Sequence, residues 1–279
     1  MFRLTWSAVN IFLLASVITL VYTGAWEYSV RHYLDGFSDA IVPNPATPEQ
    51  KVEAILNWMR SGPPRPLAEN PAELSARDPE VTLNYRQLLT VCGTATNAFL
   101  NLARSSDLNA RRLLLLTPER TAKHVVAEVL IADRWIVVDP TYRLIMRDPS
   151  GRMLTRQDLK NPATFVAATS VVPNYPQSYS YESFAHVRLA RMPFHGFGLR
   201  GVFDALYPGW EEAFDWSLLL ERESFFFFFF SWIATLFFVF MRLLMAWYAD
   251  RYLGLPRFHF FRNFARAGAT FFSTPEIEK

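Results

Sequence analysis

The chain has 279 residues, of which 51% are hydrophobic and 16% aromatic, and its formal net charge is +2. So small a charge gives no reason to expect a nucleic-acid partner, which normally meets a strongly basic surface. The single cysteine excludes an intrachain disulfide framework and a zinc site built from several cysteines. We expect neither a metal ion nor another cofactor.

Residues 4–26 predict a first transmembrane helix. These 23 residues carry no charge and are long enough to cross a hydrocarbon core, which is about 30 Å thick. Trp6 near one end and Tyr22 and Trp26 near the other are typical interfacial anchors. The alternative is a signal peptide cleaved near Thr23-Gly24-Ala25, although the apolar run is longer than such segments usually have.

A polar segment and a first amphipathic helix follow this span. Thr47 fits an N-cap, Pro48 the first helical position, and Gln50 the reciprocal partner of a capping box. Apolar residues then recur at helical spacing at Val52, Ile55, Leu56 and Met59. The stretch Gly62-Pro63-Pro64-Arg65-Pro66 is expected to end the helix and to open a loop reaching about Glu80.

A second amphipathic helix is expected to begin at Cys92, and three strands to follow it. The helix shows its apolar spacing at Ala95, Ala98, Phe99, Leu102 and Ala103. The predicted strands are Leu113–Leu116, Val125–Ile131 and Trp135–Val138, the last two joined by a tight turn at Ala132-Asp133. A helix followed by antiparallel strands predicts the α+β class.

The region from residue 140 to residue 224 has weaker signals. Residues 173–181 form a turn-rich aromatic stretch, and Pro193–Gly201 is a second loop-like region. A helix that approaches the membrane is expected over Trp210–Leu220.

Residues 225–249 predict a second transmembrane helix. Its first 17 residues, from Phe225 to Met241, are uncharged and include six consecutive phenylalanines. Arg242 interrupts the run, but a long side chain near a helix end can extend to the membrane interface. A fully buried core helix is the alternative interpretation.

The charges beside the two spans predict the topology. Residues 250–279 form a tail with Arg251, Arg257, Arg262 and Arg266 among aromatic residues, which suits an anionic inner leaflet. The presumed outer side has only Arg31 and Arg222 near the spans. The positive-inside rule therefore predicts a two-pass protein of the plasma (inner) membrane, with both termini in the cytosol and residues 27–224 as an extracytoplasmic domain.

Cys92, His124 and Asp139 have the residue types of a thiol nucleophile, its base and the group that orients the base. A thiol in the first turn of a helix feels the positive end of the helix dipole, which favours the thiolate. Each residue alone has an ordinary structural interpretation: a lone cysteine is often a small core residue, and Asp139 before Pro140 fits a turn.

The predicted hairpin brings two of these residues together. If Ala132 and Asp133 are its two central residues, Val126 faces Asp139, and His124 lies diagonal to Asp139 on the same face. The other face then carries only apolar side chains, at Val125, Ala127, Val129, Ile131, Ile136 and Val138. A shift by one residue would bury Asp139 on that apolar face.

This central stretch resembles the transglutaminase-like superfamily, whose members share a papain-like fold. The resemblance rests on Val91-Cys92-Gly93, on Arg111 after Leu108-Asn109-Ala110, and on residues 124–129 and 134–141. In the family pattern the cysteine heads a helix, an arginine closes the next short loop, and histidine and aspartate lie on neighbouring strands. Two positions differ: Asp107 stands where glycine is common, and Val126 where an aromatic residue often follows the histidine.

The resemblance implies a papain-like core, with its motif in residues 84–145, in which Cys92 is the nucleophile, His124 the general base and Asp139 its orienting partner. It implies acyl transfer or amide hydrolysis through a thioester. The oxyanion hole needs the Cys92 N–H and a second donor, for which Asn84 and Gln87 lie upstream without a basis for choosing.

The first hypothesis is a membrane-anchored thiol enzyme that acts on a peptide or a cell-envelope polymer, with membrane lipid as its surroundings. The alternative is an accessory papain-like module of a membrane assembly with other subunits, handling a surface polysaccharide and using its aromatic loops, Pro193–Gly201 and the basic tail as contact surfaces. In a third interpretation Cys92 is a core residue and the triad a coincidence.

Overall fold

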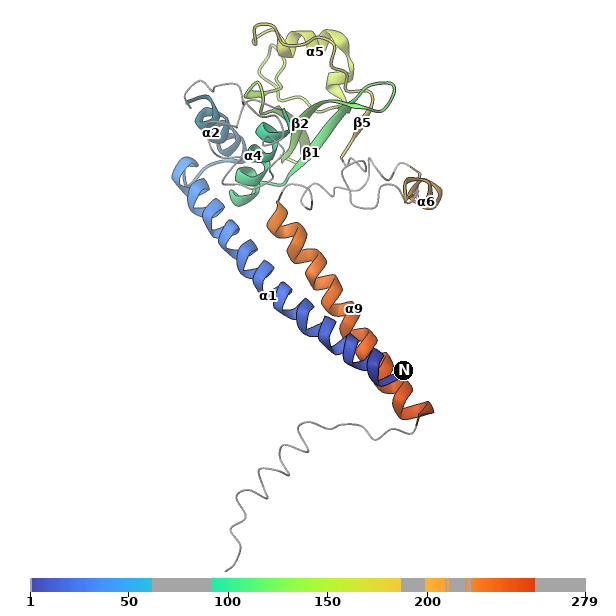
Figure 1. Ribbon diagram of the computed structural model, residues 1–279. Coiled ribbons are helices and arrows are strands. Elements are labelled where there is room, and N and C mark those ends of the chain that lie inside the picture. The colour runs from blue at the N-terminus through green and yellow to red at the C-terminus, as the bar shows by residue number, and fades with distance from the viewer. Residues whose placement is uncertain are drawn as a thin grey trace, which may run out of the picture. The chain divides into compact units, whose positions relative to one another are not determined.

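The computed structural model describes residues 2–61, 92–186, 199–208, 210, 219 and 222–253 (Figure 1). Several predicted features lie outside these residues: the helix stop at Gly62–Pro66, Asn84 and Gln87, most of the Pro193–Gly201 loop and of the Trp210–Leu220 helix, and the tail from residue 254. The chain divides into two compact units, one of which is Thr23–Phe228, while the other combines the two ends of the chain.

Two long helices run from one unit into the other. Helix α1 is Phe2–Ile41 and helix α9 is Glu223–Tyr252. Both are long and apolar enough to span a membrane, and in their most apolar 18-residue windows only 6% and 11% of the residues are buried. Many of the large apolar side chains there are exposed, so an aqueous setting would be unfavourable for both helices. Both helices extend beyond the predicted spans 4–26 and 225–249.

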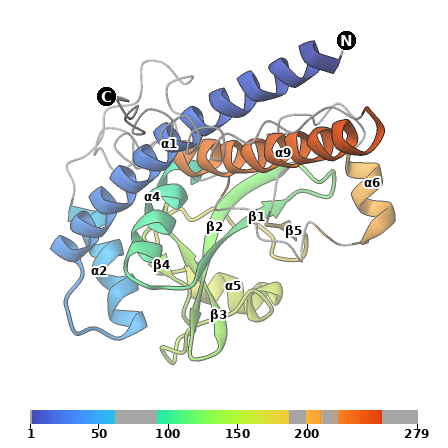
Figure 2. The same ribbon diagram turned by 90° about the horizontal axis from the view of Figure 1, so that it is seen from below.

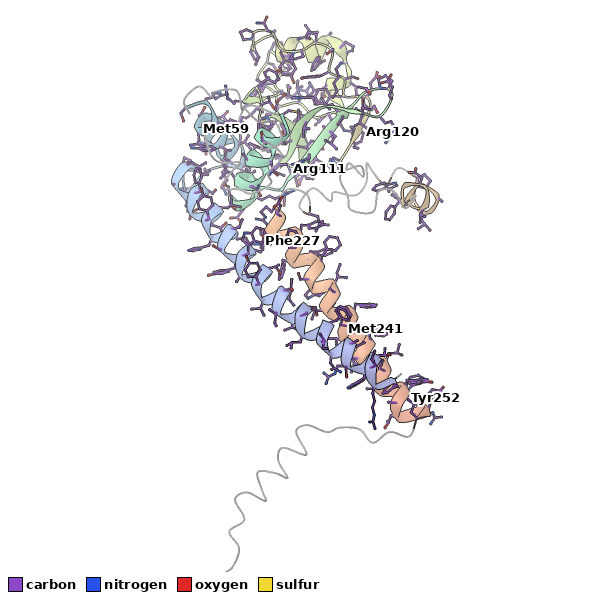
Figure 3. The ribbon with its side chains drawn as sticks, viewed as in Figure 1. Met59, Arg111, Arg120, Phe227, Met241 and Tyr252 are labelled. Atoms are coloured by element: carbon purple, nitrogen blue, oxygen red, sulfur yellow. The ribbon has the colours of Figure 1, made fainter. Side chains whose placement is uncertain are left out.

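Within the unit formed by the chain ends, α1 and α9 contact each other through aromatic side chains. The rings of Phe12 and Phe238 stack with centroids 5.6 Å apart, and the Arg242 guanidinium lies 5.9 Å from the centre of the Trp6 ring. Figure 3 shows the side chains along α9, with Phe227, Met241 and Tyr252 labelled. Phenylalanine is thus used for helix–helix contact as well as for apolar exposure.

The last part of α1 belongs to the domain. Leu34 is fully buried in its core, and Val30, Phe37 and Ile41 pack against the same cluster. Ser38 is also buried and shares a hydrogen bond with Ser106. The sequence places the end of the apolar run at Trp26, but the helical periodicity of these core contacts continues the helix by a further 15 residues, to Ile41.

Helix α2 covers Pro48–Ser61 and begins with the predicted capping box. The Thr47 N–H donates to Oε1 of Gln50 at 2.9 Å, and the Gln50 N–H donates to Oγ1 of Thr47 at 3.3 Å. The four predicted apolar residues, Val52, Ile55, Leu56 and Met59, are all buried. The spacing of apolar residues therefore identified the inner face of this helix.

A five-stranded antiparallel sheet forms the centre of the domain, in the order β4-β3-β2-β1-β5. Its strands are β1 Ala110–Leu116, β2 Ala122–Ile131, β3 Arg134–Asp139, β4 Leu144–Ile145 and β5 Phe184–Ala185. The predicted hairpin register is confirmed, because Ile131 pairs with Arg134 and Ala127 with Val138. Ala132 and Asp133 have φ of 46° and 59°, as a tight turn of the primed type requires.

Two layers cover the two faces of the sheet (Figure 2). One cluster joins α1, α2 and α4 to the face that carries Ala127, Val129, Ile136 and Val138. The other joins Leu113, Leu115, Val126 and Val137 to helix α5, Pro162–Thr169, and to the tyrosine-rich loop after it. The described domain is therefore a three-layer α+β structure, as the class prediction requires.

Helix α4, Cys92–Ser105, corrects one expectation. The sequence predicts an amphipathic helix with one apolar face, but every residue from Thr94 to Ala103 is buried. The helix lies between α2 and strands β1 and β2, so its polar side chains are enclosed too. Two of them find partners across the interface: Thr96 donates to the Val125 carbonyl at 3.0 Å, and Asn97 accepts from Arg112 at 3.2 Å.

The region after residue 140 contains more regular structure than its sequence indicates. It holds β4, a 3-10 turn η2 at Asp158–Lys160, helix α5, strand β5 and helix α6 at Leu199–Leu206. Asn161 caps α5 by accepting from the N–H groups of Ala163 and Thr164, with Pro162 at the start of the helix. The Asn-Pro pair is the sequence signal for this helix.

Candidate active site

Cys92 is the first residue of α4 as described, and it is partly exposed. The Oγ1 of Thr96, one turn later, hydrogen-bonds to the backbone of β2 beside His124, which fixes the helix start against this strand. The Cys92 thiol interacts with the side chain of His124, and the backbone of Gly93 and Val125 lies next to it. The predicted nucleophile therefore contacts the predicted base.

His124 lies on β2, at the point where its pairing with β1 becomes irregular. Leu115 pairs with His124 but Leu116 pairs with Ala122, so Lys123 is an extra residue in the ladder. Such bulges bend a strand and redirect the neighbouring side chains. The His124 side chain is only 2% exposed, and its Nε2 lies 2.7 Å from Oδ2 of Asp139. Since Nε2 is engaged by the carboxylate, Nδ1 is the nitrogen left for the thiol.

Asp139 ends β3 and is fully buried. Its Oδ2 also accepts a hydrogen bond from the Tyr175 hydroxyl at 2.7 Å. Its Oδ1 accepts from the backbone N–H groups of Thr141 at 3.0 Å and Tyr142 at 3.3 Å. A buried carboxylate requires such partners, because an isolated charge would be very unfavourable there. The turn after Pro140 thus supplies two of the donors that satisfy the buried carboxylate of Asp139.

Each member of this chain of side chains alters the charge state of the next. Burial opposes a charge on His124, but the hydrogen bonds and charges of Asp139 and Cys92 outweigh it and raise the pKa of His124 to about 9. Burial likewise disfavours a thiolate, yet the hydrogen bond and positive charge of His124 prevail and lower the pKa of Cys92. Both shifts therefore favour the thiolate–imidazolium form of the pair over its neutral form.

Three tyrosines complete the site, and the sequence did not identify them. The Tyr179 ring stacks on the imidazole of His124, with centroids 4.3 Å apart and planes inclined by 4°. The Tyr142 ring lies 6.0 Å from the same imidazole, and its side chain interacts with that of Tyr179. The third is Tyr175, bound to Asp139. For Tyr175 and Tyr179, the clustering of tyrosines in the turn-rich stretch 173–181 was the available signal, but it does not indicate where this loop packs.

Two further motif residues have structural contacts. Arg111 on β1, labelled in Figure 3, pairs with Glu128 on β2 at 2.7 Å and lies 3.9 Å from the centre of the Trp135 ring on β3. It therefore joins three strands. Asp107 has φ of 59°, a left-handed conformation that glycine adopts most easily. This explains why Asp107 is an unusual choice in the family pattern, where glycine is common.

A separate pocket of about 670 Å³ lies between α2, β4 and α5, and its lining includes Leu56, Arg60, Leu144 and Val171. None of Cys92, His124 and Asp139 lines it, so the candidate site is defined by the hydrogen-bonded side chains and not by this cavity. In the described part of the chain, no group of three or more His, Cys, Asp or Glu residues is arranged to hold a metal ion.

Comparison with known proteins identifies the central segment. Residues 35–140 match the transglutaminase-like superfamily, and this match begins within α1 and ends directly after Asp139. No curated protein and no solved structure matches the chain. The matched segment contains Cys92, His124 and Asp139 together with the helix and strands that hold them. The similarity to the transglutaminase-like superfamily thus extends over residues 35–140, the segment that carries all three candidate residues.

Proposed function

We propose that the protein is a membrane-anchored thiol enzyme that transfers or hydrolyses an acyl group of an amide through Cys92, His124 and Asp139. The observation that carries this proposal is the 2.7 Å hydrogen bond between His124 and Asp139, together with the interaction of the Cys92 thiol with the same imidazole. Its members come from α4, β2 and β3. A cysteine that served only as core packing would need neither a buried histidine nor a buried carboxylate behind it.

The reaction begins when the Cys92 thiolate attacks the carbonyl carbon of an amide and forms a carbon–sulfur bond. The imidazolium of His124 then gives its proton to the leaving nitrogen as the carbon–nitrogen bond breaks, which yields a thioester and a free amine. In the second half, His124 accepts a proton from water or from an acceptor amine as that group attacks the thioester. The carbon–sulfur bond breaks and the thiolate is regenerated. Asp139 keeps the imidazole oriented and stabilises its charge throughout.

The proposed location is the plasma membrane, with α1 and α9 as two spans and the domain on the extracytoplasmic side. The support is the exposed apolar surface of both helices and the excess of arginines after the second span. On that side the available amides are those of peptides and of envelope polymers, which we propose as the substrate class. A membrane-impermeant thiol reagent applied to intact cells should then reach Cys92, and protection that ends when the membrane is opened would contradict this orientation.

An accessory role without catalysis is a weaker second candidate. It relied partly on the aromatic loop of residues 173–181 as a contact surface, yet Tyr175 and Tyr181 are buried against the candidate site. These side chains therefore favour support of the triad over contact with a partner.

The substrate is best sought by untargeted comparison of envelope peptides and polymers from cells that carry wild-type protein or Cys92→Ala. The variant should accumulate an uncleaved or unlinked species, and His124→Ala should accumulate the same one. A matched control is Cys92→Ser, which keeps the shape but supplies a much weaker nucleophile and should resemble Cys92→Ala. Identical profiles in wild type and all three variants would rule out a catalytic role.

A further inference from the structure

We propose that Tyr175 is a positioning residue of the candidate triad, an inference that rests on the proposed function. The Tyr175 hydroxyl and His124 Nε2 both lie 2.7 Å from the same atom, Oδ2 of Asp139. Tyr175 is 4% exposed and Asp139 is fully buried, so bulk water does not compete for this oxygen. The tyrosine therefore holds in place the oxygen that orients the imidazole.

The four hydrogen bonds to Asp139 leave its carboxylate little freedom. Tyr175 and His124 bind Oδ2, while the N–H groups of Thr141 and Tyr142 bind Oδ1. An ionised carboxylate offers about four lone-pair sites, so each acceptor position here has a donor. Rotation of the carboxylate would break bonds at both oxygens. Without Tyr175, Oδ2 would be held by the imidazole alone, the group that it is meant to orient.

Because Tyr175 and His124 share this oxygen, Tyr175 also influences how tightly the His124–Asp139 pair holds its proton. A hydrogen bond to the ionised carboxylate stabilises the state in which the His124–Asp139 pair has lost its proton. Loss of that bond makes the pair hold its proton more tightly, whichever of the two residues carries it. Tyr175 therefore keeps His124 a stronger acid than Asp139 alone would allow, which helps it to protonate a leaving amine.

Other titratable side chains surround the His124–Asp139 pair, and they come from each of the elements that pack against it. Cys92 faces His124 from α4. Tyr142 faces it from the turn after β3, and Tyr179 from the loop after α5. Tyr181 faces Asp139 from the same loop as Tyr175, and Glu128 on β2 acts on Tyr181. Phenol groups are neutral over the range in which the pair titrates, and burial raises the pKa of Tyr175 and Tyr181 further. Tyr175 thus acts through its hydrogen bond, not through a charge of its own.

Tyr179 provides a matched control. It belongs to the same loop and stacks directly on His124, but its hydroxyl is not one of the four donors to the Asp139 carboxylate. Tyr179→Phe keeps the stacked ring and removes only that hydroxyl. Tyr175→Phe keeps an aromatic ring in the loop and removes the bond to Asp139. The two variants therefore differ in the one contact on which the proposal depends.

The test is a pH titration of histidine signals by NMR in the full chain, solubilised in detergent and labelled with ¹⁵N-histidine. The chain has five histidines, and the signal of His124 is the one that disappears in His124→Gln. Tyr175→Phe should raise the titration midpoint of His124 by about half a unit or more, whereas Tyr179→Phe should leave it nearly unchanged. 3-Fluorotyrosine placed at position 175 keeps the shape but donates more strongly, so it should lower the midpoint.

A midpoint that stays fixed in Tyr175→Phe, or that moves equally in Tyr179→Phe, would overturn the proposal. If Tyr175→Phe does not fold, the fluorotyrosine variant decides alone: no downward shift means that Tyr175 only packs the loop. Alkylation of Cys92 by iodoacetamide is measured in the same samples. A thiol that reacts like a free cysteine would end the proposed function, whereas the histidine titration would still report whether Tyr175 acts on the pair.

Discussion

The Thr96 hydroxyl donates a hydrogen bond to the carbonyl oxygen of Val125 at 3.0 Å, and both groups are buried. Thr96 follows Cys92 by one helical turn, and Val125 follows His124 directly. This bond therefore joins the helix of the thiol to the strand of the imidazole close to the point where the two side chains meet. This one contact therefore helps to fix the position of Cys92 on its helix relative to His124 on its strand.

Thr96→Val should weaken the site more than it weakens the fold. Valine has nearly the same shape, so packing survives, but the lost hydrogen bond should lower the free energy of unfolding by about 1–2 kcal/mol. With the helix start less firmly held, Cys92 should lose part of its contact with His124 and react more slowly with iodoacetamide at pH 6. Thr96→Ser retains the hydroxyl and should restore the rate; if serine and valine behave alike, the bond does not align the site.

The pH dependence of alkylation should separate Cys92 from an ordinary thiol. Because His124 lowers the pKa of Cys92, wild-type protein should keep reacting as the pH falls below the range of a free thiol. His124→Ala removes the positive charge, so the midpoint should rise to about 8.5. The chain has a single cysteine, so the whole signal comes from this site. Equal midpoints in wild type and His124→Ala would exclude a functional pair.

Asp139→Asn should act on Cys92 indirectly, through its effect on His124. The amide keeps the shape but cannot stabilise the imidazolium, so the pKa of His124 should fall from about 9 and the thiolate should lose part of its counter-charge. Labelling at pH 6 should therefore lie between that of wild type and that of His124→Ala. Labelling at pH 10 should be similar in all three proteins, because every thiol is then ionised. If Cys92 in Asp139→Asn reacts at pH 6 as fast as in wild type, Asp139 does not influence the Cys92–His124 pair.

Glu27 forms a buried ionic cluster that should be important for stability. It pairs with Arg222 at 2.9 Å and with Arg31 at 2.7 Å, and it accepts a hydrogen bond from Ser224 at 2.8 Å. Glu27→Leu leaves Arg222 buried without its partner and should cost about 3 kcal/mol, measured by denaturation in detergent. The double variant Glu27→Leu/Arg222→Met should cost less than the sum of the single changes. Arg31→Gln is the control: its side chain is 54% exposed, so it should matter little.

The sequence was most informative where chemistry and periodicity agreed. The capping box at Thr47 and Gln50 and the register of the β2–β3 hairpin are local features, and both are confirmed. The same register is enough to predict that His124 and Asp139 lie on one face of the hairpin. Cys92, by contrast, could be placed near them only through the family resemblance, because helix-to-sheet packing is not encoded by spacing alone.

The features that were missed all depend on contacts between distant parts of the chain. The continuation of α1 to Ile41 follows from the burial of Leu34 beneath the domain, which no local pattern signals. The burial of α4 on all sides arises from the layers around it. Tyr175 and Tyr179 reach the site because Phe184 and Ala185 return to pair with β1, and a two-residue strand is too short to recognise in sequence.

That return of the chain has a consequence for the order of events during synthesis. Cys92, His124 and Asp139 leave the ribosome before Tyr175, and the strand that secures the tyrosine loop follows only at residues 184–185. Until then the hairpin can form, but Oδ2 of Asp139 lacks one of its donors and the imidazole lacks its stacked ring. The thiol therefore acquires its full reactivity late, once most of the segment between the two long helices has been made. A truncated chain that ends near residue 145 would carry the complete motif without the finished site.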